Sequence, residues 1–155
     1  MTLPRFQGNV CMDGMLKKTY VMYLIPAAIA FVVLTLLKAS SALNPGDISY
    51  PPIVAPFIFF LSVLFALAAP IFYRTVFAHS VRDMKHTTTH ELLLFERNLI
   101  RIALITPYLG LVAYMLDFPN MYFGGCILMS LYALYYFYPS QARLAFEKRI
   151  FKVRE

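Results

Sequence analysis

Charged residues are scarce in this chain of 155 residues, making up 14% of the total, and four long segments lack them completely. These charge-free segments are Thr19–Leu37, Ile48–Tyr73, Ile102–Leu116 and Phe118–Ala142. The hydrocarbon core of a bilayer is about 30 Å thick and takes roughly 20 apolar helical residues to cross. The third segment reaches that length if Leu99 and Ile100 are included and Arg101 extends its guanidinium to the interface. The sequence therefore predicts an all-α integral membrane protein, a bundle of four transmembrane helices.

Cysteine and histidine are also rare, and their positions exclude several kinds of membrane site. The two cysteines, Cys11 and Cys126, fall in the amino-terminal arm and the last apolar segment, so we expect no disulfide between them. No charge-free segment contains a histidine, whereas a membrane haem needs axial ligands at that depth. These segments also lack Asp and Glu, whereas ion-driven transporters retain an ionisable residue inside the membrane. We expect no cofactor, and we find no catalytic triad, phosphate-binding loop or nucleic-acid motif.

The distribution of positive charge predicts the orientation of the four spans. The single expected membrane domain, 1–155, comprises an arm (1–19), spans at 20–37, 52–73, 99–116 and 120–138, a connection (74–98) and an amphipathic tail (140–155). Twelve of the 14 Lys and Arg residues fall in the arm, connection or tail, Arg101 follows the connection at the start of the third span, and Lys38 is the exception. By the positive-inside rule these parts are cytoplasmic, so two helical hairpins carry both termini on the inner side. We expect an uncleaved first span in a bacterial inner membrane, with the mitochondrial inner membrane as the alternative.

The net charge of +6 indicates contact with anionic lipid rather than with nucleic acid, because it is concentrated beside the apolar segments. Each basic residue near such a surface contributes about 1 kcal/mol of attraction. The predicted headgroup contacts are Lys17, Lys18, Arg74, Arg101, Arg143, Lys148, Arg149 and Lys152.

All three histidines lie in the connection between the second and third spans. On an unbroken helix, His79, Asp83 and His86 follow one another at i, i+4 and i+7, an acceptable spacing for a metal site. Solvated or headgroup-facing histidines are the simpler interpretation, since no cysteine or further carboxylate lies near them in the sequence. A metal- or quinone-dependent redox component is therefore the third functional alternative.

Tyrosines are abundant near the ends of the third and fourth spans. Most of them fit the aromatic belts found at membrane interfaces. Tyr108, Tyr114 and Tyr132 fall deeper, where each hydroxyl needs a hydrogen-bond partner, and could line a ligand or quinone cavity. Ordinary packing of buried aromatic rings is the competing interpretation.

Short motifs predict where the helices begin and end. Thr88 and Glu91 form a capping box, which predicts a new helix from Thr89 that continues without interruption as the third span to Leu116. The sequence Asp117–Asn120 predicts a tight turn between the last two spans. Pro139 ends the fourth span, and Ser140 is positioned to cap an amphipathic helix on the inner membrane surface.

The function favoured by these patterns is non-enzymatic. We expect an accessory, assembly or scaffold subunit of a larger membrane complex, because the spans carry no chemistry and the cytoplasmic helices suit docking. The alternative is a small homo-oligomeric transporter or channel for an uncharged or hydrophobic solute, with proline-containing helices lining its path.

Overall fold

The computed structural model describes residues 5–40, 49–82 and 88–150, and every regular element in these ranges is helical. The elements are α1 (Arg5–Ala39), α2 (Val54–Val63), a π-helical turn (Leu64–Ala68), α3 (Ala69–Val81), α4 (Thr89–Ala103), α5 (Thr106–Met115), α6 (Asn120–Tyr136) and α7 (Gln141–Ile150). The all-α fold class predicted from the sequence is therefore confirmed.

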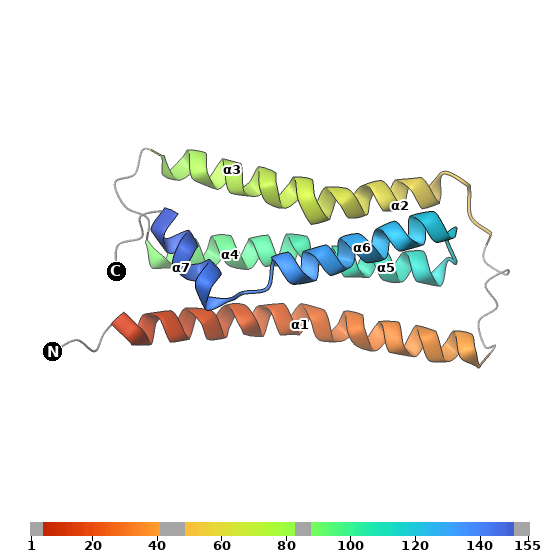
Figure 1. The fold of residues 1–155 in the computed structure, drawn as a ribbon, viewed down its shortest axis with the longest axis horizontal. Coiled ribbons are helices and arrows are strands. Elements are labelled where there is room, and N and C mark those ends of the chain that lie inside the picture. Colours follow the sequence, from red (N-terminus) through yellow and green to blue (C-terminus); the bar gives the residue numbers. More distant parts are fainter. Residues whose placement is uncertain (1–4, 41–48, 83–87, 151–155) are drawn as a thin grey trace.

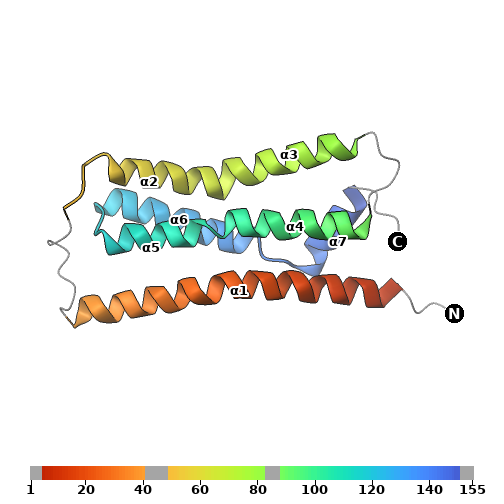
Figure 2. The same cartoon turned by 180° about the vertical axis from the view of Figure 1, so that it is seen from behind.

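The helices form an elongated bundle of four rods with a short seventh helix at one end (Figure 1). The rod α4–α5 runs through the centre, with α1 on one side and α2–α3 on the other, and both views of the ribbon agree on this order (Figure 2). Helix α6 packs on α5 and α2. The start of α1, the end of α3, the start of α4 and α7 share one end, here called the α7 end (Figure 1). The other end, where α5 turns into α6, is called the hairpin end.

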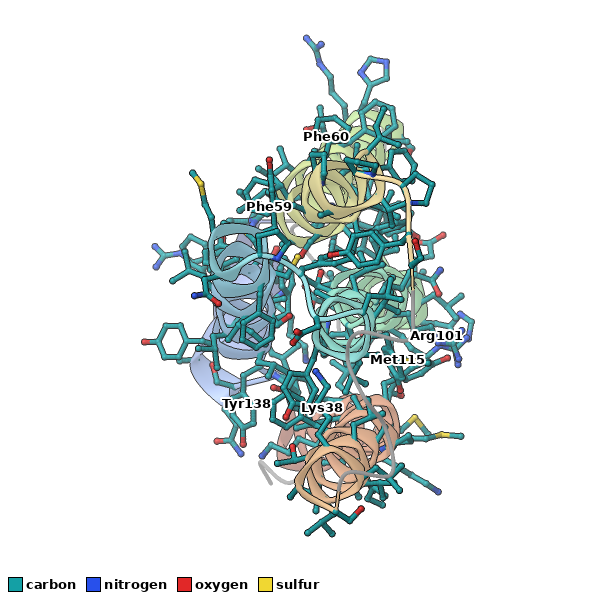
Figure 3. All side chains as sticks on the ribbon, turned by 90° about the vertical axis from the view of Figure 1, so that its right-hand side faces the viewer. Lys38, Phe59, Phe60, Arg101, Met115 and Tyr138 are labelled. Carbon is teal, nitrogen blue, oxygen red and sulfur yellow. The ribbon has the colours of Figure 1, made fainter. Side chains whose placement is uncertain are left out.

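Helix α1 is longer than its predicted span. It begins at Arg5 and continues through Pro26 to Ala39, so most of the predicted arm belongs to the same helix as the first span. At the hairpin end it stops beside Lys38, whose ammonium group points toward the neighbouring rod (Figure 3).

The second rod is helical throughout but changes its hydrogen-bond pattern before Pro70. Proline has no backbone N–H and cannot bond to the carbonyl one turn earlier, here that of Ala66. The π-helical turn accommodates this missing hydrogen bond, and in it the N–H of Ala69 donates to the carbonyl of Leu64. Such a turn inserts an extra residue locally, and the rod bends gently where α2 meets α3 (Figure 1).

The third rod differs from the prediction at one place. The sequence predicted an unbroken helix from Thr89 to Leu116, whereas the structure divides it at Leu104 and Ile105 into α4 and α5. Pro107 explains the division, because its missing N–H leaves the carbonyl of Ala103 without its helical donor. The start of the rod is as predicted.

That start is the capping box. The N–H of Glu91 donates to Thr88 Oγ1 at 3.3 Å, and the N–H of Thr88 donates back to Glu91 Oε2 at 3.0 Å. Two of the backbone donors that a helix start leaves unpaired are satisfied in this way.

The predicted turn between the last two spans is also confirmed. Asp117 adopts a φ of 51°, the left-handed conformation that ends many helices. The N–H of Phe118 then donates to the carbonyl of Ala113 at 3.2 Å, which closes the end of α5 and directs the chain into α6. Beyond α6, the N–H of Arg143 donates to Ser140 Oγ at 3.3 Å, so Ser140 caps α7 as predicted.

Within the described residues, three helical segments are long and apolar enough to cross a membrane. They are Gly14–Ala39, Val54–Ser80 and Thr89–Met115, and an 18-residue window within each has a mean hydropathy of 2.3, 2.4 and 1.4, respectively. Large apolar side chains cover their outer surfaces, as Met22, Ile71 and Phe72 illustrate. Small buried residues lie between α2, α5 and α6, among them Ala55, Ser62, Thr106, Ala113, Cys126 and Ser130. Small residues inside and large apolar residues outside are typical of helices packed in lipid.

Candidate functional site

The residues predicted as metal ligands are only partly described by the structure. Asp83 and His86 lie outside the described residues. His79, near the end of α3, and His90, in the first turn of α4, are both exposed. Within the described part of the chain, no group of three His, Cys, Asp or Glu side chains is arranged to hold a metal ion.

The three deep tyrosines have different neighbours. Tyr108 donates to the carbonyl of Tyr23 on α1 at 2.7 Å. The ring of Tyr114 lies 5.0 Å from that of Phe31, also on α1, measured between centroids. Tyr132 stacks on Tyr136 of its own helix at 5.4 Å. Tyr108 and Tyr114 thus attach α1 to α5, whereas Tyr132 lies on the outer side of α6 with 37% of its surface exposed.

The basic residues predicted to contact lipid headgroups are of two kinds in the structure, exposed and paired. Lys18, Arg101 and Arg149 are exposed, and Arg101 points away from the bundle (Figure 3). Arg74 and Arg143 instead make ion pairs with carboxylates. Lys17 and Lys148 are half-buried, and Lys152 lies outside the described residues.

An ion cluster at the α7 end is the most densely charged site described. It consists of Arg74 from α3, Glu96 from α4, and Arg143 and Glu147 from α7. Arg74 Nη2 lies 3.1 and 3.2 Å from the two carboxylate oxygens of Glu147. Arg143 Nη2 lies 3.2 Å from Glu96 Oε2.

The carboxylates of the ion cluster are much more deeply buried than its guanidiniums. The side chains of Glu96 and Glu147 are 2% and 3% exposed, against 16% for Arg143 and 36% for Arg74. Buried carboxylates are rare in proteins unless they are paired, because desolvation of a charge is costly. Two guanidinium groups and two carboxyl groups therefore pair with one another where three helices meet.

Further contacts hold Arg143 in place. Its Nη1 donates to the carbonyl of Tyr136 at 3.0 Å, at the end of α6. Its guanidinium lies 5.3 Å from the ring centroid of Phe137. The second carboxyl oxygen of Glu96, Oε1, and Nε of the next residue in the chain, Arg97, are buried without a hydrogen-bond partner.

The buried carboxylates were not predicted from the sequence. Glu96 falls in the connection predicted before the third span, whereas the apolar helical segment Thr89–Met115 includes this residue. The signal was present in the pattern of α4, whose buried residues Leu92, Phe95, Leu99 and Ile100 form an apolar row that also contains Glu96. A charged residue inside such a row requires a partner, and Arg143 could not have been chosen without the fold.

A second group of polar residues lies near the middle of the bundle. We call Ser62 (α2), Thr106 (α5), Cys126 and Ser130 (α6) the polar patch. Ser130 Oγ lies 3.2 Å from the carbonyl oxygen of Thr106 and 2.8 Å from that of Cys126. The hydroxyl oxygens of Ser62 and Thr106 are buried without a hydrogen-bond partner.

The hairpin end carries one more ion pair. Lys38 Nζ donates to the carbonyl of Tyr114 at 2.6 Å and lies 3.2 Å from Asp117 Oδ1. It also lies 4.3 Å from the centroid of the Tyr114 ring. Lys38, which the sequence places between the first and second predicted spans, therefore joins the end of α1 to the end of α5.

Comparison with known proteins found no protein-family model, no curated protein and no solved structure that matches this chain.

Proposed function

We propose that this chain is a four-pass, non-enzymatic accessory, assembly or scaffold subunit of a larger complex in a bacterial inner membrane. Its fourth pass is α6, whose 17 residues extend about 26 Å. That length is at the lower limit for a membrane span, and the helix carries no charged side chain. With four passes and a positive arm, connection and tail, the α7 end faces the cytoplasm.

The observation that carries this proposal is the use of charged side chains as links within the bundle. Lys38–Asp117, Arg74–Glu147 and Arg143–Glu96 each join residues far apart in the sequence. The first pair joins α1 to the turn between α5 and α6, and the other two join α7 to α3 and α4. Side chains that neutralise one another in this way fix helices in place instead of presenting a reactive group to a substrate. The pairing of these charges therefore supports a structural role for the chain as a rigid scaffold.

Helix α1 offers the surface that we assign to the partner. One of its faces packs on α4 and α5, while the opposite face exposes large apolar side chains along its whole membrane length. These exposed residues are Met22, Ile25, Ile29, Val32 and Leu36. Their spacing of three and four residues alternates, as it does in the seam between two long packed helices. A transmembrane helix of the partner would pack along this row.

Substitution on the α1 row tests the proposal directly. Ile29→Trp places a large side chain at the centre of the row, where Ile29 is 58% exposed. Ile71→Trp is the matched control, because Ile71 is 63% exposed on the outer side of α3. After gentle detergent extraction, we expect the unmodified chain and Ile71→Trp to elute with a stoichiometric partner, and Ile29→Trp to elute without it. An unmodified chain that purifies as a clean monomer contradicts the proposal.

A further inference from the structure

The central rod α4–α5 has one side that the other described helices leave uncovered. Helix α1 packs on one side of it, α2 and α3 pack on the opposite side, and α6 packs on a third. Figure 3 looks along this rod and shows α6 to its left, with Arg101 and Met115 to its right. The apolar residues on this uncovered side are 37 to 44% exposed. We call it the open strip, and its members, spaced three, four or seven residues apart, are Arg97, Arg101, Ile105, Val112 and Met115.

The open strip is cationic toward the α7 end and apolar toward the hairpin end. Asn98 Nδ2 donates to Tyr73 Oη at 3.2 Å, and these two residues lie where the third predicted span begins and the second ends. Arg97 and Arg101 flank Asn98 on the same helix, so both lie within about 5 Å of this level along the axis. An arginine side chain at that depth extends its guanidinium to the headgroup region. The strip therefore has the polarity of a phospholipid, with a charged end at the interface and an apolar end in the bilayer.

Within the described part of the chain, no carboxylate pairs with either arginine of the open strip. The carboxylates whose side chains are described make their bonds elsewhere: Glu91 to Thr88, Glu96 to Arg143, Asp117 to Lys38 and Glu147 to Arg74. Arg97 Nε is moreover buried without a hydrogen-bond partner. Two like charges four residues apart on a helix repel one another, so the pair destabilises α4 unless an anion joins it. The anion that suits them therefore comes from outside the described chain.

We propose that the open strip binds one anionic phospholipid, whose phosphate pairs with Arg97 and Arg101 and whose acyl chain lies along Ile105, Val112 and Met115. Guanidinium groups suit phosphate because their donors match two of its oxygens at once. The lipid carries a net negative charge because two arginines face it without a carboxylate, so a zwitterionic headgroup would leave positive charge in excess. The site rests on the proposed membrane placement of the chain, but not on the partner or on the row of α1.

A single tryptophan beside the open strip tests the site in bilayers, because the chain has no tryptophan of its own. Ile105→Trp places this reporter one turn from Arg101, and Phe60→Trp is the control, since Phe60 is 64% exposed and turned away from the bundle (Figure 3). Phosphatidylglycerol and phosphatidylcholine with identical brominated acyl chains quench tryptophan on contact. We expect Ile105→Trp to show a preference of about fivefold for phosphatidylglycerol, the gain from one basic residue beside an anionic surface, and Phe60→Trp to show none.

Removal of single charges separates this site from the general attraction of a basic protein to anionic lipid. Arg101→Gln should abolish most of the preference at Ile105→Trp, whereas Arg149→Gln, which removes another exposed cation, should leave it unchanged. Because Arg101 is exposed and unpaired, its replacement should not lower the unfolding temperature in lipid-free detergent, which shows that the fold is kept.

Three results overturn the lipid site. They are equal preferences at the two reporters, as expected if a carboxylate of a partner helix occupied the open strip, a preference that survives Arg101→Gln, and loss of the preference to inorganic phosphate but not to chloride at equal ionic strength. If brominated phosphatidylcholine quenches neither reporter, the proposed membrane placement itself is contradicted, so the two failures are distinguishable.

Discussion

At the scale of single residues, small side chains decide how closely the helices approach. Gly125 on α6 faces Phe59 on α2, and a Cβ at that position would lie 2.9 Å from Phe59 Cδ2. Figure 3 shows Phe59 turned toward α6 and its neighbour Phe60 turned away from the bundle. Gly124 has open space around it. Of these two adjacent glycines, only Gly125 is needed for the close contact between α6 and α2.

This difference gives a prediction with an internal control. Gly125→Ala forces the Phe59 ring to move, and overpacking of this kind costs roughly 1–3 kcal/mol. Gly124→Ala meets nothing within 4 Å and should be neutral, or stabilising by up to about 1 kcal/mol because alanine favours the helix. Unfolding of both variants in the same detergent measures the two effects. A loss of stability in Gly124→Ala as large as that in Gly125→Ala would refute this account of the α2–α6 contact.

At the scale of the elements, charge pairs fix the short helix α7 against the bundle. Leu144 and Glu147 of α7 are buried, while Phe146 and Ile150 remain exposed on its outer side. These two apolar residues therefore stay available to the membrane surface on which the amphipathic tail is expected to lie. The ion cluster holds the other face through Arg74 and Glu96.

A double-mutant cycle measures what the Glu96–Arg143 pair contributes. Glu96→Leu alone leaves Arg143, 16% exposed, without its carboxylate, and we expect a loss of about 3 kcal/mol in the free energy of unfolding. Adding Arg143→Leu should recover most of that loss, because an apolar pair of similar size replaces a buried ion pair at little cost. The control is Arg101→Gln, which removes a charge from an exposed position of the same helix. Additive losses in the double variant would show that the two side chains act independently.

The sequence predicted the elements better than the contacts between them. Capping residues, turn residues and charge-free length act locally, so the starts of α4 and α7 and the α5–α6 turn were found correctly. The division at Leu104 was missed although Pro107 was visible, because a proline in a membrane helix can produce a bend, a break or neither, as Pro26 in the continuous α1 shows. The ion cluster was missed because its pairs are separated by 73 and 47 residues.

At the scale of the whole molecule, the exposed surface and the placement of the ends agree with a bilayer environment. Three long apolar segments display large apolar side chains on their outer faces, and the polar groups between the helices are mostly paired with one another. Both ends of the described chain lie at the α7 end (Figure 1). This placement is consistent with the four passes that we propose, in which α6 is the fourth.

Labelling of single cysteines in sealed vesicles by an impermeant thiol reagent tests this arrangement most directly. Lys18 and Arg82 are exposed toward the α7 end, and Ser40 and Asn120 are exposed toward the hairpin end. Each is changed to Cys in a Cys11→Ser background that retains the buried Cys126. Positions 18 and 82 should be labelled only from the cytoplasmic side, and positions 40 and 120 only from the opposite side. Labelling of positions 82 and 120 from the same side would contradict the four-pass membrane bundle.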